Sequence, residues 1–145
     1  MTRIAVIGCG YVGAVSAACF AELGHHVDCI DTDESRVALL QQGRGPIYEP
    51  GLDELLRRGL EAGRLTFSSA YPDRFEARTV FIAVNTPEAE DGAADIRGVR
   101  DAVAMVAPRL LPGSIIVNKS TVPIGTGELA AGMAERAGAV DLPVV

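Results

Sequence analysis

The sequence predicts an α/β protein built on a doubly wound parallel sheet. Three observations favour this class. Short, continuous apolar runs alternate with segments of helical periodicity, no internal repeat interrupts the alternation, and the glycine-rich stretch GCGYVG at 8–13 follows the first apolar run directly. Because parallel strands are joined by right-handed helical crossovers, helices should cover both faces of the sheet. We therefore expect three layers, α/β/α, of the Rossmann type.

The first two strands and helices are expected from local patterns. RIAVI at 3–7 is short, continuous and rich in Ile and Val, as a strand buried on both faces should be. A helix is expected over 11–23, where apolar residues recur among many small ones. HVDCID at 26–31 is the second expected strand. Asp33 is then placed to cap a helix that ends near Gly43.

The rest of the chain continues the alternation. GRGPIYEPG at 43–51 holds three glycines and two prolines, which predicts a loop of fixed shape. The next helix carries Leu52, Leu55, Leu56 and Leu60 on one stripe. Further strands are expected at 65–67, 79–84 and 114–118, further helices at 96–110 and 124–137, and the opening of another strand at 142–145.

Composition excludes several classes of function. With 145 residues the chain is expected to form one domain. Its net charge of −6 argues against an extended nucleic-acid surface and gives no support for binding anionic membranes. Three cysteines without a CxxC pair predict neither a disulfide framework nor a metal site, so each is expected to be a small packing residue. No signal peptide or membrane span is recognisable at the start, which favours a cytoplasmic protein. The apolar ending DLPVV is typical of a cut inside a longer protein.

The three glycines of GCGYVG predict a phosphate-binding turn. Gly8 allows a tight turn, Gly10 lets the backbone approach a pyrophosphate, and Gly13 lets the helix pack close to the strand. The start of the helix supplies free N–H groups and partial positive charge for the anion. An ordinary turn is the alternative, but a strand before it and a helix after it favour the dinucleotide site. FAD-binding domains and some methyltransferases share this pattern.

Asp31 makes NAD the expected cofactor. It lies 18 residues after Gly13 at the end of the second expected strand, where a carboxylate accepts hydrogen bonds from the adenosine ribose. A 2′-phosphate beside this carboxylate would cost about 1–4 kcal/mol, which disfavours NADP. A helix-capping role is the alternative for Asp31. Arg36 is expected to cover the adenosine side.

Four further stretches carry a family resemblance: IDTDESRV at 30–37, GPIYEPGLDELL at 45–56, VNTPEAEDGAADI at 84–96 and NKSTVPIGT at 118–126. Together with GCGYVG, and in this order, they resemble the N-terminal part of the UDP-glucose/GDP-mannose dehydrogenases. The resemblance is closest to the members that act on UDP-glucose, and it implies oxidation of a nucleotide sugar's C6 alcohol to a carboxylate with two NAD reduced. The family's nucleophilic Cys, in a GSCFPKD-like motif, does not occur in this sequence.

The resemblance also implies site residues and partners. The pyrophosphate turn would comprise Gly8, Gly10, Tyr11, Val12 and Gly13. Asp31 and Arg36 would contact the ribose. Thr86, which is expected to close the fourth strand, and Thr121 would make contacts near the nicotinamide. Thr121 would also help to order a water by the reacting carbon, although either threonine could instead satisfy loop backbone. The nucleotide sugar would bind a C-terminal domain outside this sequence, and the whole protein would be a homo-oligomer.

Two other functions stay open on the sequence. A stand-alone NAD-binding regulatory module would keep the fold without dehydrogenase activity. Another dehydrogenase of similar architecture, of the hydroxyacid or 6-phosphogluconate type, is less favoured because GPIYEPGL and KSTVPIGT match the nucleotide-sugar family. In every case this chain alone is expected not to oxidise sugars.

Overall fold

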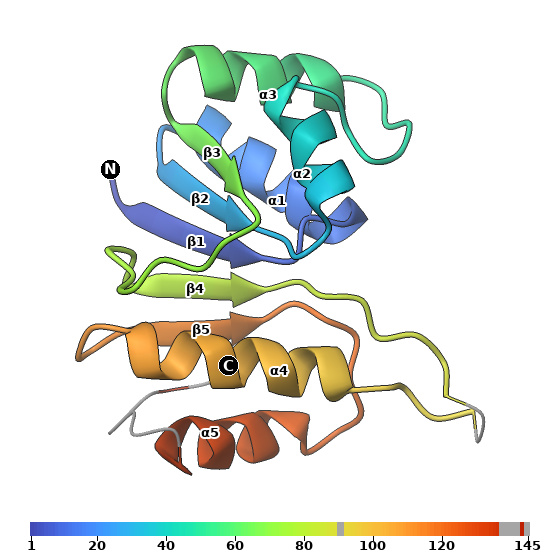
Figure 1. Ribbon diagram of the computed structural model, residues 1–145, viewed down its shortest axis with the longest axis vertical. Helices are drawn as coiled ribbons and strands as arrows, with labels where there is room; N and C mark the ends of the chain where they lie inside the picture. The colour runs from blue at the N-terminus through green and yellow to red at the C-terminus, as the bar shows by residue number, and fades with distance from the viewer. Residues whose placement is uncertain (90–91, 137–142, 144–145) are drawn as a thin grey trace.

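The computed structural model describes residues 1–89, 92–136 and 143, and these form a three-layer α/β/α domain. Within them the chain forms one parallel sheet in the order β3-β2-β1-β4-β5 (Figure 1). The elements are β1 (Arg3–Ile7), α1 (Tyr11–Glu22), β2 (His26–Ile30), α2 (Glu34–Gln41), α3 (Leu52–Glu61), β3 (Leu65–Ser68), β4 (Thr79–Ile82), α4 (Arg97–Val106), the 3₁₀ turn η1 (Ala107–Arg109), β5 (Ile115–Asn118) and α5 (Thr126–Arg136). The predicted fold class is confirmed.

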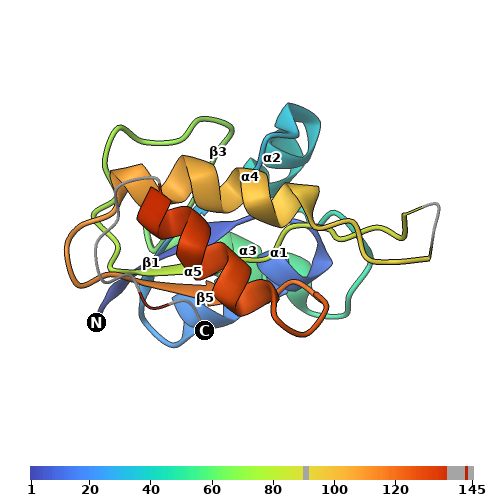
Figure 2. The same cartoon turned by 90° about the horizontal axis from the view of Figure 1, so that it is seen from below.

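Both faces of the central strand β1 are buried, which explains its continuous apolar run. Along β1, Ile4 and Val6 belong to a core shared with α1, α2 and α3, whereas Ala5 and Ile7 belong to a second core shared with α4 and α5. Figure 2 shows α4 and α1 on opposite sides of the strands. A central strand with no polar face is therefore fixed from both sides.

Two expected elements and one expected packing residue differ from the structure. β4 ends at Ile82 and not at residue 84, so Thr86 lies in the following loop and does not close the strand. The ladder stops because β1 itself ends at Ile7, whose carbonyl takes its last bond from the Ala83 amide at 2.8 Å. The helix expected over 96–110 is α4 followed by the short turn η1. Cys19 is exposed, so only Cys9 and Cys29 are the packing residues expected.

The last expected strand, 142–145, lies outside the described residues except for Pro143. The Pro143 carbonyl accepts a hydrogen bond from the Ile116 amide of β5 at 3.1 Å. Of the helices described, none is long and apolar enough to cross a membrane.

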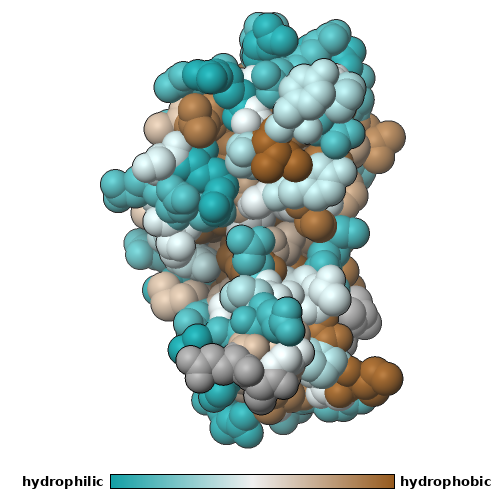
Figure 3. Space-filling view, turned by 90° about the vertical axis from the view of Figure 1, so that its right-hand side faces the viewer, coloured by the Kyte–Doolittle hydropathy of each residue, from teal (hydrophilic) through white to brown (hydrophobic). Residues whose placement is uncertain are grey.

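The sheet order places a crevice at one edge of the molecule. β1 has β2 on one side and β4 on the other, so the strand order reverses at β1 and β4. All arrowheads in Figure 1 point toward this edge, and Figure 3 looks onto it. Hydrophobic and hydrophilic side chains are interspersed there (Figure 3). Ligands of open parallel sheets bind outside the carboxyl ends of the strands at such a reversal.

Candidate cofactor site

The three glycines of the turn after β1 differ in the structural reason for having no side chain. Gly8 has φ +90°, and a Cβ there would lie 2.7 Å from the Ala83 carbonyl oxygen. A Cβ on Gly13 would lie 1.8 Å from the Gly8 carbonyl oxygen, so the first turn of α1 packs directly on the turn that precedes it. A Cβ on Gly10 would meet only Asn85 Oδ1, at 3.4 Å. Internal packing therefore requires glycine at 8 and 13, whereas Gly10 leaves its space open to the crevice.

The start of α1 offers uncapped amide groups to that space. Gly10 is the N-cap and has no side chain to accept a hydrogen bond, and the first turn contains no acidic residue. The Ala14 amide is bonded to the Gly10 carbonyl at 2.9 Å, so the amides before it have no partner within the helix. Tyr11 and Val12 are 48% and 44% exposed at this end. Amides and helix dipole together favour an anion here.

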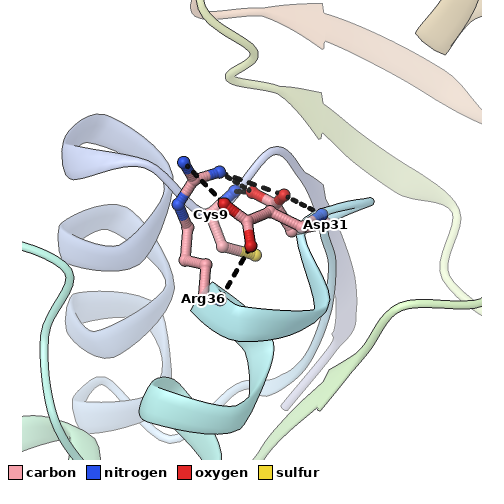
Figure 4. Close-up of polar contacts among 4 residues, drawn as sticks. Cys9, Asp31 and Arg36 are labelled. Carbon is pink, nitrogen blue, oxygen red and sulfur yellow. Dashed lines mark hydrogen bonds and ion pairs between the residues drawn. The ribbon is translucent and has the colours of Figure 1, made fainter.

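Asp31 ties three segments together beside the turn (Figure 4). It follows β2 directly and is 7% exposed. Its Oδ2 accepts from the Cys9 amide at 2.6 Å, and its Oδ1 accepts from the Asp33 amide at 2.9 Å. Arg36 Nη1 donates to both oxygens, at 2.9 and 3.1 Å. The carboxylate thus has a structural role in the glycine turn and at the start of α2, while Asp33 is the residue that caps α2, by accepting from the Arg36 amide.

The contact with Arg36 changes the charge presented to a ligand. The hydrogen bond that Arg36 donates to Asp31 is the main cause that raises the pKa of Arg36 above its ordinary value, and the charges of Asp31 and Asp33 add to it. The guanidinium therefore neutralises much of the Asp31 charge. Electrostatic repulsion of a 2′-phosphate would therefore be weaker than an unpaired carboxylate would give. Discrimination against NADP would then depend also on the hydrogen bonds that the two Asp31 oxygens already accept.

Two neighbouring hollows flank the glycine turn and share Ala83, Val84 and Asn85. The first has a volume of about 200 Å³ and the second about 150 Å³. The first is lined further by Ile7, Gly8, Gly10, Ile30, Asp31, Thr32, Arg36 and Tyr71, and the second by Tyr11, Val12, Thr86, Lys119, Ser120 and Thr121. All the predicted site residues except Gly13, which is buried beneath the turn, line one hollow or the other.

The two predicted threonines meet in the second hollow. The Thr86 hydroxyl donates to the Thr121 carbonyl at 2.7 Å, so the loop after β4 is fastened to the loop after β5. Ser120 adds a parallel link, because its hydroxyl donates to the Val84 carbonyl at 2.8 Å. Thr86 therefore has the loop-satisfying role that the sequence left open, and it still faces the hollow. The Thr121 side chain is exposed there.

Two residues of the site were missed on the sequence. Asn85 lines both hollows and lies across from Gly10. Tyr71, in the loop between β3 and β4, lines the first hollow. Burial is the main cause that raises the pKa of Tyr71, and the nearby charge of Asp31 adds to it. Asn85 could have been found from its place in VNTP, but no motif marks Tyr71.

A sequence model described as UDP-glucose/GDP-mannose dehydrogenase family, NAD binding domain, matches residues 2–144. The chain belongs to this family. It corresponds to the family's NAD-binding domain, which confirms the cofactor expected from Asp31 and the glycine turn.

Individual members of the family are similar over most of this chain. The UDP-glucose 6-dehydrogenase of Pseudomonas aeruginosa is 51% identical over 127 residues, which are 87% of this chain and 28% of that protein. A UDP-glucose dehydrogenase structure from Pyrobaculum islandicum matches with a TM-score of 0.84 at 41% identity, over 99% of this chain and 34% of that one. A UDP-D-ManNAc dehydrogenase structure from Pyrococcus horikoshii matches with a TM-score of 0.92 at 29% identity, over 99% of this chain and 34% of that one. The chain thus spans about a third or less of the length of these relatives.

Proposed function

We propose that NAD binds along the carboxyl edge of the sheet, across both hollows. The observation that carries this proposal is the open space at Gly10, beside the uncapped amides of α1. The pyrophosphate would lie against Gly10, Tyr11 and Val12, where anions are favoured. Internal packing requires glycine at 8 and 13 but not at 10. The missing side chain at Gly10 therefore leaves room for a ligand, and the residues of the turn fit a dinucleotide.

The two halves of the cofactor would then occupy different hollows. The adenosine half would lie in the first hollow, with Asp31 and Arg36 at its ribose. The nicotinamide half would lie in the second, beside Thr86 and Thr121. Each hollow is smaller than an ordinary ligand pocket of about 300–1,000 Å³, but the two adjoin through shared walls.

We further propose that the whole protein is a nucleotide-sugar dehydrogenase acting on UDP-glucose. The 51% identity to a UDP-glucose 6-dehydrogenase supports this substrate. Bound NAD⁺ would supply the hydride acceptor, and this chain would hold it and shape the edge of the crevice. Thr121 would assist near the nicotinamide. The sugar-binding part and the nucleophilic Cys would come from outside these residues, and homo-oligomer formation stays a prediction from the resemblance.

The cofactor proposal is tested by calorimetric titration of the 145-residue chain with NAD⁺ and NADP⁺. We expect NAD⁺ to bind and NADP⁺ to bind at least about ten-fold more weakly, equivalent to about 1.4 kcal/mol. Asp31→Asn should narrow that gap, whereas Asp33→Asn, the matched control at the cap of α2, should not. Tighter binding of NADP⁺, or no binding of either at millimolar concentration, would contradict the proposal.

The substrate proposal needs the full-length protein. With saturating NAD⁺, UDP-glucose should be oxidised faster than GDP-mannose or UDP-N-acetylmannosamine, and two NAD should be reduced for each sugar consumed. A faster rate with either of the other two nucleotide sugars would replace UDP-glucose as the proposed substrate and leave the NAD site standing.

A further inference from the structure

The loop between β3 and β4 brings one aromatic side chain to the cofactor edge. Tyr71 is half-buried and packs against the core formed by α4, α5 and their face of the sheet. The same side chain lines the first hollow together with Asp31 and Arg36. Its hydroxyl has no hydrogen bond to any residue that the structure describes. Packing thus holds the ring, while no polar contact within the described chain accounts for its place at the hollow.

The order of groups along the sheet edge matches the order of groups in a dinucleotide. The sheet runs β3, β2, β1, β4. Tyr71 follows β3, Asp31 follows β2 and the glycine turn follows β1. A dinucleotide runs from adenine through ribose to pyrophosphate. If the ribose lies at Asp31 and the pyrophosphate at Gly10, the adenine must extend toward the end of β3, where Tyr71 lies.

We propose that Tyr71 is the platform on which the adenine ring of the cofactor stacks. This inference rests on the proposed NAD site. The other side chains that give the first hollow apolar walls are aliphatic: Ile7, Ile30, Ala83 and Val84. Among the lining residues Tyr71 therefore offers the flat π surface that a purine prefers. Its phenol is neutral at working pH, as an ordinary tyrosine is, and burial raises its pKa further.

The experiment uses AMP, which carries adenine, ribose and phosphate without the nicotinamide half. The chain has no tryptophan and three tyrosines, so its tyrosine emission can report stacking directly. In wild type, AMP should bind and lower this emission. Tyr71→Phe should bind AMP with an affinity within about two-fold, since a ring is kept, but most of the AMP-dependent loss of tyrosine emission should disappear. Tyr71→Leu keeps apolar bulk without a π face and should bind AMP and NAD⁺ about 5- to 150-fold more weakly.

Tyr48→Phe is the matched control, because Tyr48 is 91% exposed and lines none of the hollows described. It should keep both the affinity and the loss of emission. Tyr71→Leu binding AMP as tightly as wild type would overturn the inference, as would an undiminished loss of emission in Tyr71→Phe. In that case NAD⁺ binding by wild type would leave the proposed function intact. A wild type that binds neither NAD⁺ nor AMP would overturn both. Should Tyr71→Leu fail to fold, the emission of Tyr71→Phe decides alone.

Discussion

Gly10→Ala and Gly13→Ala separate the needs of the cofactor from the needs of the fold. At Gly10 the backbone has φ −66° and ψ −161°, which alanine adopts without strain, and the new Cβ would meet only Asn85 Oδ1 at 3.4 Å. At Gly13 the new Cβ would lie 1.8 Å from the Gly8 carbonyl oxygen. Neither partner of that clash is a flexible side chain, so the turn and α1 must move apart.

The expected magnitudes differ accordingly. NAD⁺ at a hundred times its Kd should stabilise wild type by about 2.7 kcal/mol, or roughly 5–10 °C in Tm for a chain of this size. Without cofactor, the free energy of unfolding of Gly10→Ala should lie within about 1 kcal/mol of the wild-type value, because only the N-cap glycine of α1 is exchanged. This variant should lose the NAD⁺-dependent rise in Tm. Gly13→Ala should lose about 3 kcal/mol or more with or without cofactor, as overpacked sites do.

Thermal unfolding followed by circular dichroism, with and without NAD⁺, measures both quantities. Gly127→Ala is the control, because a Cβ at this helical position meets nothing within 4 Å, so this variant should keep the full NAD⁺-dependent rise. A Gly10→Ala variant that retained the rise would refute the assignment of the pyrophosphate to this space. A Gly13→Ala variant that melted like wild type would refute the packing argument.

Three further predictions concern single polar contacts. Asp31→Asn should lower the free energy of unfolding by about 2 kcal/mol in urea titrations, because charge-assisted hydrogen bonds are lost, and an unchanged midpoint would contradict this. The pKa of Asp95 is lowered to about 2, first by hydrogen bonds from the Arg97 side chain and then by one from the Arg97 backbone amide. The contribution of Asp95 to stability is therefore present above the ordinary carboxyl pKa near 4 and is lost as pH falls toward 2. In an NMR titration, Arg97→Gln should raise the Asp95 midpoint from about 2 toward 4 without reaching it, because the backbone bond remains; a midpoint that stays near 2 would exclude the side chain as the main cause. Thr86→Val should lower the free energy of unfolding by about 0.5–1 kcal/mol, because the hydrogen bond to the Thr121 carbonyl is lost. Thr86→Ser keeps a hydroxyl and should retain the wild-type stability. Equal melting temperatures for the two variants would argue against a contribution from this hydrogen bond.

The sequence predicted the elements that local pattern determines. β1 is a continuous apolar run because both of its faces are covered, and α2 begins where its capping Asp33 stands. β4 was predicted too long because Ala83 and Val84 are apolar. What ends the strand is the turn at Gly8 in its neighbour, and a single run of residues does not contain that information.

The candidate site divides in the same way. The glycine turn and Asp31 are recognisable because close packing at Gly8 and Gly13 and the expected ligand chemistry at Gly10 and Asp31 require fixed residue types at fixed spacing. Tyr71 belongs to a loop whose position depends on how α4, η1 and the sheet pack, so no spacing marks it. The bond between Thr86 and Thr121 joins residues 35 apart, and it follows only from the adjacency of β4 and β5.

The several bonds of Asp31 have a consequence for protein engineering. Exchange of cofactor preference in such domains is attempted by replacing the carboxylate at the ribose. Here the same carboxylate holds the Cys9 amide and the start of α2, so a designer who removes it also loosens the glycine turn proposed to bind the pyrophosphate. A redesign for NADP would need a second substitution that holds the Cys9 amide in place. Under the proposed function, cofactor preference and scaffold integrity depend on the same side chain and would have to evolve together.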